Sequence, residues 1–334
     1  MNNLKNRTIE LYEKGFRPCE IAKMLEAELN ESNLYNKIRG YIRTYTGKRR
    51  KTEVYIEPGY GRESMIHDQE PAKQLTILQN QEPEHFSQKW DGLKVIRFGL
   101  ISDTHFSSKY TQTSYLHDFY DFCKREGITA IYHAGDITDG LKMRAGHEFE
   151  LYEHSADGQV ADVIRNYPRR DGITTYFITG NHDASLYKHV GYDIGPAIAR
   201  DRDDMVYLGR DCAVVNLTPN CTLELRHPWD GTAYALSYKI QKMIESMESD
   251  SKPNILAVGH YHKQGHFMHR NVHGILVPCF EAQTPFTRGK GISTVLGGYI
   301  ITLHVDENGT IQRMIPEFVP YYKSIKDDYK NYKH

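Results

Sequence analysis

The sequence predicts a layered α/β domain preceded by a small all-α domain. Beyond Leu93, short apolar runs alternate with longer amphipathic segments, which is the pattern of strands and helices packed in layers. Before residue 48, three short stretches place apolar side chains at helical spacing. The composition, 39% hydrophobic and 25% charged over 334 residues, is that of a globular protein with a sizeable core.

Composition also excludes several classes of protein. No stretch approaches the roughly 18 consecutive apolar residues of a transmembrane helix, and the polar start from Met1 to Lys5 lacks the apolar segment of a secretory signal. We therefore expect a cytoplasmic protein without a membrane partner. The five cysteines are widely spaced and form no C-x-x-C pair, which argues against both a disulfide framework and a thiolate zinc site.

Residues 1–47 predict three short helices. The first spans about residues 4–14 and ends at Gly15, Pro18 opens the second, and the third runs from about Glu31 to Thr44. This order resembles a helix-turn-helix domain, whose last helix enters the DNA major groove. The alternative is a small helical bundle used for packing or homo-oligomerisation.

The charge of the first part favours a nucleic-acid partner. Residues 1–51 carry a net charge of +6 and the remainder carries −7. A run of basic residues without an acidic neighbour predicts a surface that faces phosphates. The predicted nucleic-acid contacts are Lys37, Arg39, Arg43, Lys48, Arg49, Arg50 and Lys51.

Residues 48–92 are expected to form a linker or extended arm, because they are polar and contain several prolines and glycines. Residues such as Ile77 and Trp90 give this arm enough apolar character to pack on the following domain. That domain is predicted to span residues 93–320. Residues 321–334 are expected to be a mobile basic tail.

Within residues 93–320, the apolar runs predict the strands and the amphipathic segments predict the helices. Short runs bounded by turn residues indicate strands buried in a sheet. The predicted strands are 95–101, 130–133, 175–179, 222–225, 255–258, 274–280, 299–305 and 311–315, with a hairpin turn at 306–309. The predicted helices are 115–126 and 234–248.

Polar residues that suit a divalent cation follow five of these strands. Asp103 and His105 follow the first, and a spacing of two in extended chain lets both side chains reach one ion. Carboxylate, imidazole and amide groups are ligands of hard or borderline divalent metals. The segments, in chain order, are Asp103-Thr104-His105, Gly135-Asp136, Gly180-Asn181-His182-Asp183, His227 and Gly259-His260-Tyr261-His262.

With these segments the chain resembles the calcineurin-like metallophosphoesterase superfamily, whose pattern is D-x-H, G-D, G-N-H-[DE], H and G-H-x-H. The resemblance covers roughly residues 93–305 and implies a layered αββα sandwich with two divalent metal ions. We expect Mn²⁺ to support activity best, with Fe or Zn²⁺ possible. The resemblance implies that Asp103, His105 and His262 hold the first ion, that Asn181, His227 and His260 hold the second, and that Asp136 bridges them.

The resemblance also assigns catalytic roles. His182 stays free of metal and contacts the phosphate or protonates the leaving oxygen, and a hydroxide that bridges the metal ions is the nucleophile. Asp183 is expected to orient the His182 ring through its other nitrogen. No further cofactor is implied.

Other aromatic and imidazole side chains leave alternatives open. Trp229 follows His227 closely, so it could stack on a base or sugar, or it could be a core tryptophan that fixes the loop. The remaining histidines near the motifs could line the cleft, but such residues are more often structural. They are His133, His147, His154, His189, His266, His269 and His273.

Departures from subfamily patterns narrow the substrate. The protein phosphatases of this superfamily carry an arginine soon after the second motif, whereas this chain reads Gly135-Asp136-Ile137-Thr138-Asp139-Gly140. The G-N-H-D form is shared with the SbcD-type nucleases and the cyclic-nucleotide phosphodiesterases. We therefore predict a phosphodiesterase, first a DNA nuclease that the basic domain tethers to its substrate. The alternatives are a small-nucleotide or cyclic-nucleotide phosphodiesterase and a DNA-binding scaffold with an inactive phosphoesterase fold.

Overall fold

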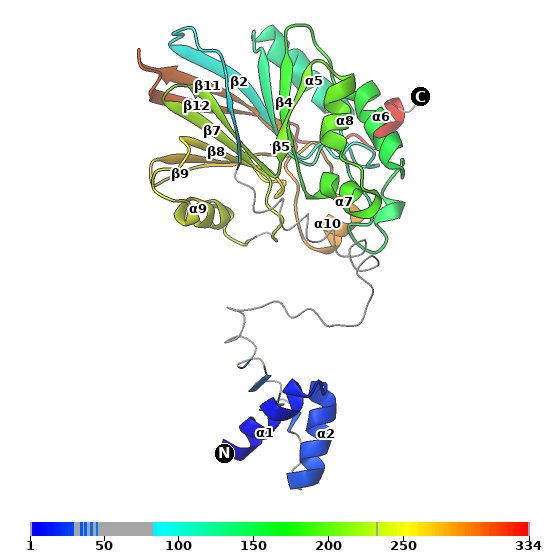
Figure 1. Ribbon diagram of the computed structural model, residues 1–334. Helices are drawn as coiled ribbons and strands as arrows, with labels where there is room; N and C mark the ends of the chain where they lie inside the picture. The colour runs from blue at the N-terminus through cyan, green and yellow to red at the C-terminus, as the bar shows by residue number, and fades with distance from the viewer. Residues whose placement is uncertain are drawn as a thin grey trace. The chain divides into compact units, whose positions relative to one another are not determined.

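The computed structural model of the protein describes residues 2–29, 34, 35, 37, 38, 41, 42, 45, 83–231 and 233–332. The chain divides into two compact units, residues 1–65 and 66–334. Figure 1 shows both units, coloured along the chain.

The first unit contains the helices α1 (Asn2–Glu13) and α2 (Pro18–Leu29). Gly15, with a φ of 89°, occupies the turn between them, a conformation that glycine adopts without steric penalty. The described positions from 35 to 45 are also helical, in agreement with the third predicted helix. Side chains from all three segments form one small core of Leu11, Ile21, Ala22, Leu25, Leu34, Ile38 and Ile42. Because these seven buried apolar residues form a hydrophobic core of its own, the unit meets a basic requirement of a separate domain.

The second unit contains two six-stranded sheets. Sheet A has the strand order β1 (Glu84–Ser87), β6 (Cys212–Thr218), β7 (Cys221–Arg226), β8 (Ile255–Val258), β10 (Val272–Leu276) and β9 (Gly265–His269). Sheet B has the order β12 (Ile311–Pro320), β11 (Gly297–Val305), β2 (Val95–Ile101), β3 (Ala130–Ala134), β4 (Thr174–Thr179) and β5 (Met205–Arg210). Strands β2 to β5 run parallel, as do β7 and β8, so the carboxyl ends within each set lie on one edge.

The two sheets pack face to face through an apolar layer. Phe98, Leu100 and Tyr132 of sheet B belong to the same buried cluster as Leu223 and Ile255 of sheet A. These runs are apolar on both faces because helices cover the outer faces. The predicted strands at 95–101, 130–133, 175–179, 222–225 and 255–258 are confirmed as β2, β3, β4, β7 and β8.

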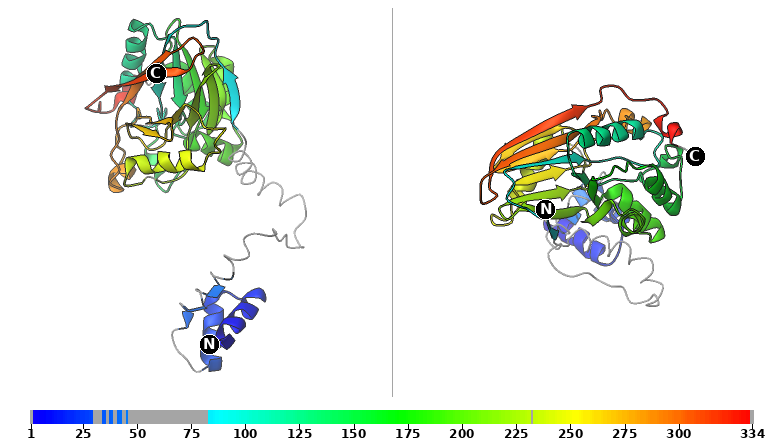
Figure 2. Two further views of the ribbon diagram at one scale, coloured as in Figure 1. Left: turned by 90° about the vertical axis from the view of Figure 1, so that its left-hand side faces the viewer. Right: turned by 90° about the horizontal axis from the view of Figure 1, so that it is seen from above.

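Helices complete four layers. Figure 1 shows α5, α6 and α8 on one side of the sheets and α9 on the other, and Figure 2 (left) shows α9, in yellow, lying over sheet A. Ile240 and Ile244 of α9 pack on Leu256 and Val272 of sheet A. The helices of this unit are α5 (Thr113–Arg125), α6 (Ala156–Asn166), α7 (Asn181–Val190), α8 (Ile194–Asp201), α9 (Leu236–Ser246) and α10 (Pro285–Gly289), with 3₁₀ turns η1 (His147–Phe149) and η2 (Asp328–Asn331). The predicted αββα sandwich is confirmed.

Both ends of this unit differ from the prediction. Residues 84–87, assigned to the arm, form β1, which pairs in parallel with β6, so the sandwich begins before residue 93. The tail beyond residue 320 also packs on the sandwich. The carboxylate of Asp328 is fully buried and accepts hydrogen bonds from the backbone and hydroxyl of Ser114, and Tyr329 stacks on Tyr152. None of the helices in the described part of the chain is long and apolar enough to cross a membrane.

Candidate metal centre

The five predicted ligand segments meet at one edge of the sandwich. Three of them follow β2, β3 and β4 in sheet B, and two follow β7 and β8 in sheet A. Because each set of strands is parallel, the segments leave the sheets at the same edge. This is where polar side chains can gather without interrupting the apolar layer between the sheets.

The first cluster consists of Asp103, His105 and His262. The Nε2 atoms of His105 and His262 lie 3.2 Å apart. Asp103 Oδ1 lies 3.2 Å from His262 Nε2 and 3.8 Å from His105 Nε2. The backbone N–H of His260 donates to both oxygens of Asp103, which fixes the carboxylate. These three donors face a common point, as the resemblance implied.

The second cluster consists of Asp136, His227 and His260, with Asn181 beside it. His227 Nε2 lies 3.0 Å from Asp136 Oδ2 and 3.2 Å from Asn181 Oδ1. His227 Nδ1 donates to the carbonyl of Ala134 at 2.7 Å, which leaves Nε2 as the ligating nitrogen. The rings of His227 and His260 are 5.3 Å apart.

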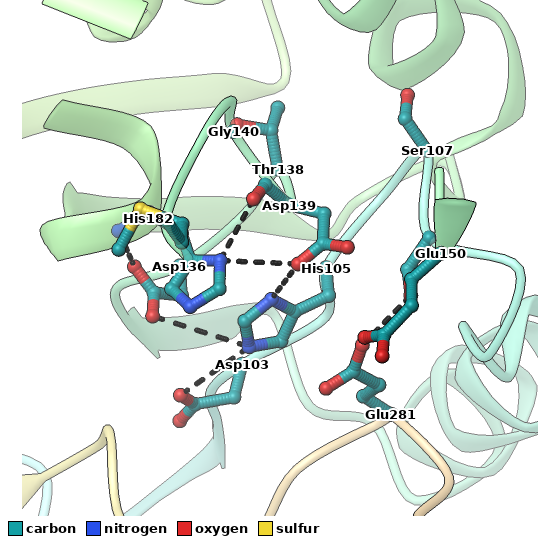
Figure 3. Close-up of polar contacts among 12 residues, drawn as sticks. Asp103, His105, Ser107, Asp136, Thr138, Asp139, Gly140, Glu150, His182 and Glu281 are labelled. Carbon is teal, nitrogen blue, oxygen red and sulfur yellow. Dashed lines mark hydrogen bonds and ion pairs between the residues drawn. The ribbon is translucent and has the colours of Figure 1, made fainter. Parts of the chain in front are cut away.

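Asp136 lies between the two clusters. Its Oδ2 is 3.0 Å from His227 Nε2 and 3.9 Å from His105 Nε2, while Oδ1 accepts the backbone N–H of His182 at 2.8 Å. Figure 3 shows Asp136, His105 and Asp103 side by side. The structure therefore brings all seven predicted ligands together, with Asp136 between the two clusters.

Electrostatics within the clusters favours bound cations. Burial alone would raise the pKa of Asp103, but the neighbouring His262 and His105 hold it well below its usual range. Burial lowers the pKa of His227, yet the adjacent Asp136 carboxylate outweighs it and the pKa rises to about 9. The carboxylate of Asp103 thus stays ionised, and the raised pKa of His227 means that its ring holds a proton. A bound divalent cation would displace that proton.

The side chains present fit two divalent cations. Asp103, Asp136, His105 and His227 are each at most 1% exposed, and burying such groups without a counter-charge is costly. The donor set mixes carboxylate and amide oxygens with imidazole nitrogens and contains no thiolate, which suits Mn²⁺, Fe or Zn²⁺.

The backbone around the ligands is strained. Five non-glycine ligands have a left-handed φ, a conformation that costs an L residue roughly 1–2 kcal/mol. They are Asp103 (52°), His105 (45°), Asp136 (55°), His260 (75°) and His262 (53°). Strain of this kind persists where the surrounding structure imposes it, commonly at functional sites.

Three motif glycines surround the His227 imidazole. A Cβ at Gly135 would lie 2.4 Å from His227 Nδ1, and one at Gly259 would lie 3.0 Å from the same atom. A Cβ at Gly180 would lie 2.4 Å from Asp136 Oδ1 and 2.6 Å from His227 Cδ2. The glycines of the G-D, G-N-H and G-H motifs therefore make room for the ligand contributed by β7.

The carboxylate that contacts His182 is Asp139, which the sequence analysis did not assign. Asp139 Oδ1 lies 3.0 Å from Nδ1 of both His182 and His105 (Figure 3). Asp139 Oδ2 lies 3.3 Å from His147 Nε2. His182 Nδ1 is also 2.7 Å from the Asp139 carbonyl. Both contacts hold the His182 ring. The signal in the sequence that could have identified Asp139 was its position three residues after Asp136.

The prediction that Asp183 orients His182 is wrong. The carboxylate of Asp183 instead accepts the backbone N–H groups of Gly180, Ile137 and Thr138 and the Thr138 hydroxyl, at 2.8–3.1 Å. Burial and the negative charge of Asp136 raise the pKa of Asp183 to about 6. Asp183 thus fastens the loop after β3 to the first turn of α7.

A cavity of about 460 Å³ opens over the two clusters. Besides the ligands and His182, two groups of side chains line it: one around Trp229 and Tyr261, and one on and beside α10. Trp229 is 36% exposed, and its Nε1 donates to Asp211 Oδ1 at 2.8 Å. Trp229 is therefore a fixed cavity wall and not a core tryptophan.

The remaining predicted residues lie elsewhere or outside the described residues. His133 is buried behind the site, where its Nδ1 accepts the Gly135 backbone N–H, and His147 contacts Asp139. His266 and His273 stack on each other away from the cavity. Among the predicted nucleic-acid contacts, Lys37 is described and exposed. The side chains of Arg39, Arg43, Lys48, Arg49, Arg50 and Lys51 lie outside the described residues.

The chain is similar to several solved structures at low sequence identity. A solved structure of a novel archaeal phosphodiesterase is 14% identical, with a TM-score of 0.37, over 66% of this chain and 99% of the other. A predicted phosphoesterase from Streptococcus pneumoniae TIGR4 is 11% identical, with a TM-score of 0.32, over 68% and 99%. Vps29 from Entamoeba histolytica complexed with Zn²⁺ is 14% identical, with a TM-score of 0.34, over 67% and 99%. No curated protein matched.

The sandwich and its two clusters define a metal-dependent phosphoesterase, a hydrolase of phosphate esters. The family model of calcineurin-like phosphoesterases matches residues 96–298, which hold all seven ligands, His182 and Asp139. The chain belongs to the calcineurin-like phosphoesterase family.

Proposed function

We propose that this protein is a phosphodiesterase that cleaves nucleic acid, DNA in the first place, with two divalent cations of which Mn²⁺ activates best. The observation that carries the diester proposal is the cavity lining. Beyond the clusters, the cavity has one wall around Trp229 and another at α10. A diester carries a substituent on each of two ester oxygens, so a site for it needs two such walls.

The side chains of this site divide the work of hydrolysis. When bound, the two cations would neutralise phosphoryl oxygens and activate water. Asp139 holds Nδ1 of His182 at 3.0 Å, so the ring presents Nε2 to the cavity. From there Nε2–H donates to a phosphoryl oxygen or gives its proton to the leaving oxygen. Asp136 and Asp103, fixed by backbone N–H groups, keep the ligand sets in register.

The preference for a nucleic-acid substrate rests on the first unit. Its sequence carries a net charge of +6 over residues 1–51, and Lys37 is exposed. A module that binds phosphates raises the concentration of cleavable diesters near the second unit. A cyclic nucleotide is the second candidate, because a cavity of about 460 Å³ holds a molecule of that size.

Hydrolysis assays with Mn²⁺ test this proposal. The protein should hydrolyse bis(p-nitrophenyl) phosphate faster than p-nitrophenyl phosphate, and His182→Ala should lower the diester rate by about 10²-fold or more. DNA, RNA and cyclic nucleotides are then compared at several salt concentrations. DNA binding should weaken steeply with salt, as expected when phosphates are neutralised by basic side chains. Faster hydrolysis of the monoester, or an unchanged rate in His182→Ala, would contradict the proposal.

A further inference from the structure

Two basic side chains from separate segments line the cavity beside α10. Arg144 follows β3 in the chain, and Lys290 follows α10 directly. They meet at the ring of Phe286, also part of the cavity wall. The Arg144 guanidinium carbon lies 4.1 Å from the ring centroid and Lys290 Nζ lies 6.0 Å from it. A cation over an aromatic face is held by the ring quadrupole, so Phe286 positions both charges.

The charges of this pair are only partly neutralised. Arg144 forms an ion pair with Glu150, but a guanidinium has five N–H donors and one carboxylate cannot occupy them all. Lys290 has no ion-pair partner in the described part of the chain. Glu281 also lines the cavity, yet it accepts the Ser108 hydroxyl and lies 4.0 Å from His262 Nδ1. Its charge therefore faces the first metal cluster.

Neither Arg144 nor Lys290 is required by the hydrolysis described under the proposed function. The scissile phosphate is served by the two ligand clusters and by His182. Within the described part of the chain, the side-chain contacts of Arg144 and Lys290 are with Glu150 and Phe286 and with none of these groups. A cationic pair in the same cavity is thus available to another anionic group of the same substrate. Guanidinium and ammonium groups bind phosphate through charge-assisted hydrogen bonds.

We propose that Arg144, Lys290 and Phe286 form a subsite for a second phosphate, the one adjacent to the scissile diester along a nucleic-acid strand. This inference rests on the proposed function and narrows its substrate class. A strand presents a phosphate at every nucleotide, whereas a cyclic nucleotide presents only the phosphate that reacts. The subsite therefore favours strands over cyclic nucleotides.

Matched pairs of substrates test the subsite. One pair is the p-nitrophenyl ester of thymidine 5′-phosphate with and without a 3′-phosphate. The other is the p-nitrophenyl ester of thymidine 3′-phosphate with and without a 5′-phosphate. Within a pair the reacting bond and leaving group are identical, and the two pairs cover both strand polarities. The quantity measured is the ratio of kcat/KM within each pair at a fixed Mn²⁺ concentration.

The unmodified protein should prefer the doubly phosphorylated member of one pair by about tenfold or more, as expected for charge-assisted hydrogen bonds. Lys290→Gln should reduce this ratio several-fold, and Arg144→Gln with Lys290→Gln should bring it close to one. Lys290 is exposed, so Lys290→Gln should leave the fold intact. This single variant therefore tests the subsite even if the Arg144 variant fails to fold. Lys94→Gln, an exposed lysine just before β2, should leave the ratio unchanged.

Two results would overturn the subsite. One is a ratio near one in both pairs for the unmodified protein, with bis(p-nitrophenyl) phosphate still hydrolysed. The other is an unchanged ratio in the Arg144 and Lys290 variants. That result would mean that these residues contact the scissile phosphate or stabilise the fold, and do not bind a second phosphate. If no diester at all is hydrolysed, the proposed function itself fails, and the subsite with it.

Discussion

Replacing Asp139 by asparagine should change which leaving groups the enzyme can expel. Asp139 is the one carboxylate within 3.3 Å of three imidazoles among the described residues, those of His105, His147 and His182. Asparagine keeps the volume and one acceptor oxygen but loses the negative charge. Its one oxygen can still accept from Nδ1 of both His105 and His182, but these bonds lose the negative charge that strengthens them, and the amide nitrogen, a donor, faces His147 Nε2.

Two losses of different kind follow. Weakening the support of His105, a metal ligand, lowers metal affinity or activity by about 10–100-fold for every substrate. Weakening His182 as an acid adds a factor of about 10²–10⁴, but only where the leaving oxygen needs a proton. A nucleoside alkoxide needs one, whereas p-nitrophenolate leaves without it.

The assay compares kcat/KM for dithymidine monophosphate and bis(p-nitrophenyl) phosphate at saturating Mn²⁺. Asp139→Asn should lose at least about tenfold more activity on the dinucleotide than on the nitrophenyl diester. Asp183→Asn is the matched control. Its carboxylate holds backbone N–H groups, so this variant should be less stable but lose activity on both substrates equally. Equal losses for Asp139→Asn would refute its assignment as the residue that positions His182.

Three further outcomes are expected. Gly180→Ala should weaken metal binding by about tenfold or more, because its Cβ would displace His227. At Gly191 a Cβ meets no atom within 4 Å, so Gly191→Ala should affect stability alone. Calorimetric titration with Mn²⁺ distinguishes the two variants. Removing metal with EDTA should lower Tm by roughly 5–10 °C relative to Mn²⁺ at 100 times its Kd, and an unchanged Tm would argue against metal binding. Burial and the neighbouring Arg170 lower the pKa of His117, although its hydrogen bond to the Asn166 carbonyl opposes this. The neutral ring therefore stabilises the fold above pH ~6.5, and that contribution is lost on acidification. His117→Gln should therefore flatten the decline in urea midpoint between about pH 7.5 and 5.5, and an equal decline in both proteins would contradict the assignment.

Local pattern was enough for the central strands and the ligands. A strand buried on both faces is a continuous apolar run, so β2, β3, β4, β7 and β8 could be read directly. Strands β1, β5, β6 and β9 were missed. The residues of β1 are mostly exposed and those of β9 alternate between exposed and partly buried, and β1 exists only through its pairing with β6. The docked tail was missed for a similar reason, since the burial of Asp328 depends on Ser114, far away in the chain.

The sequence by itself indicated which side chains could bind metal, because the ligand motifs are short, each follows an apolar run that is typical of a strand, and their order resembles that of a known family. Only the tertiary structure decided which carboxylate serves His182. Asp183 is adjacent in sequence, but at the third position of α7 its side chain turns back to the N–H of Gly180, as a capping carboxylate does. Asp139 reaches His182 from the loop after β3. Arg144 and Lys290 meet at Phe286 for the same reason, since distance along the chain does not fix distance in space.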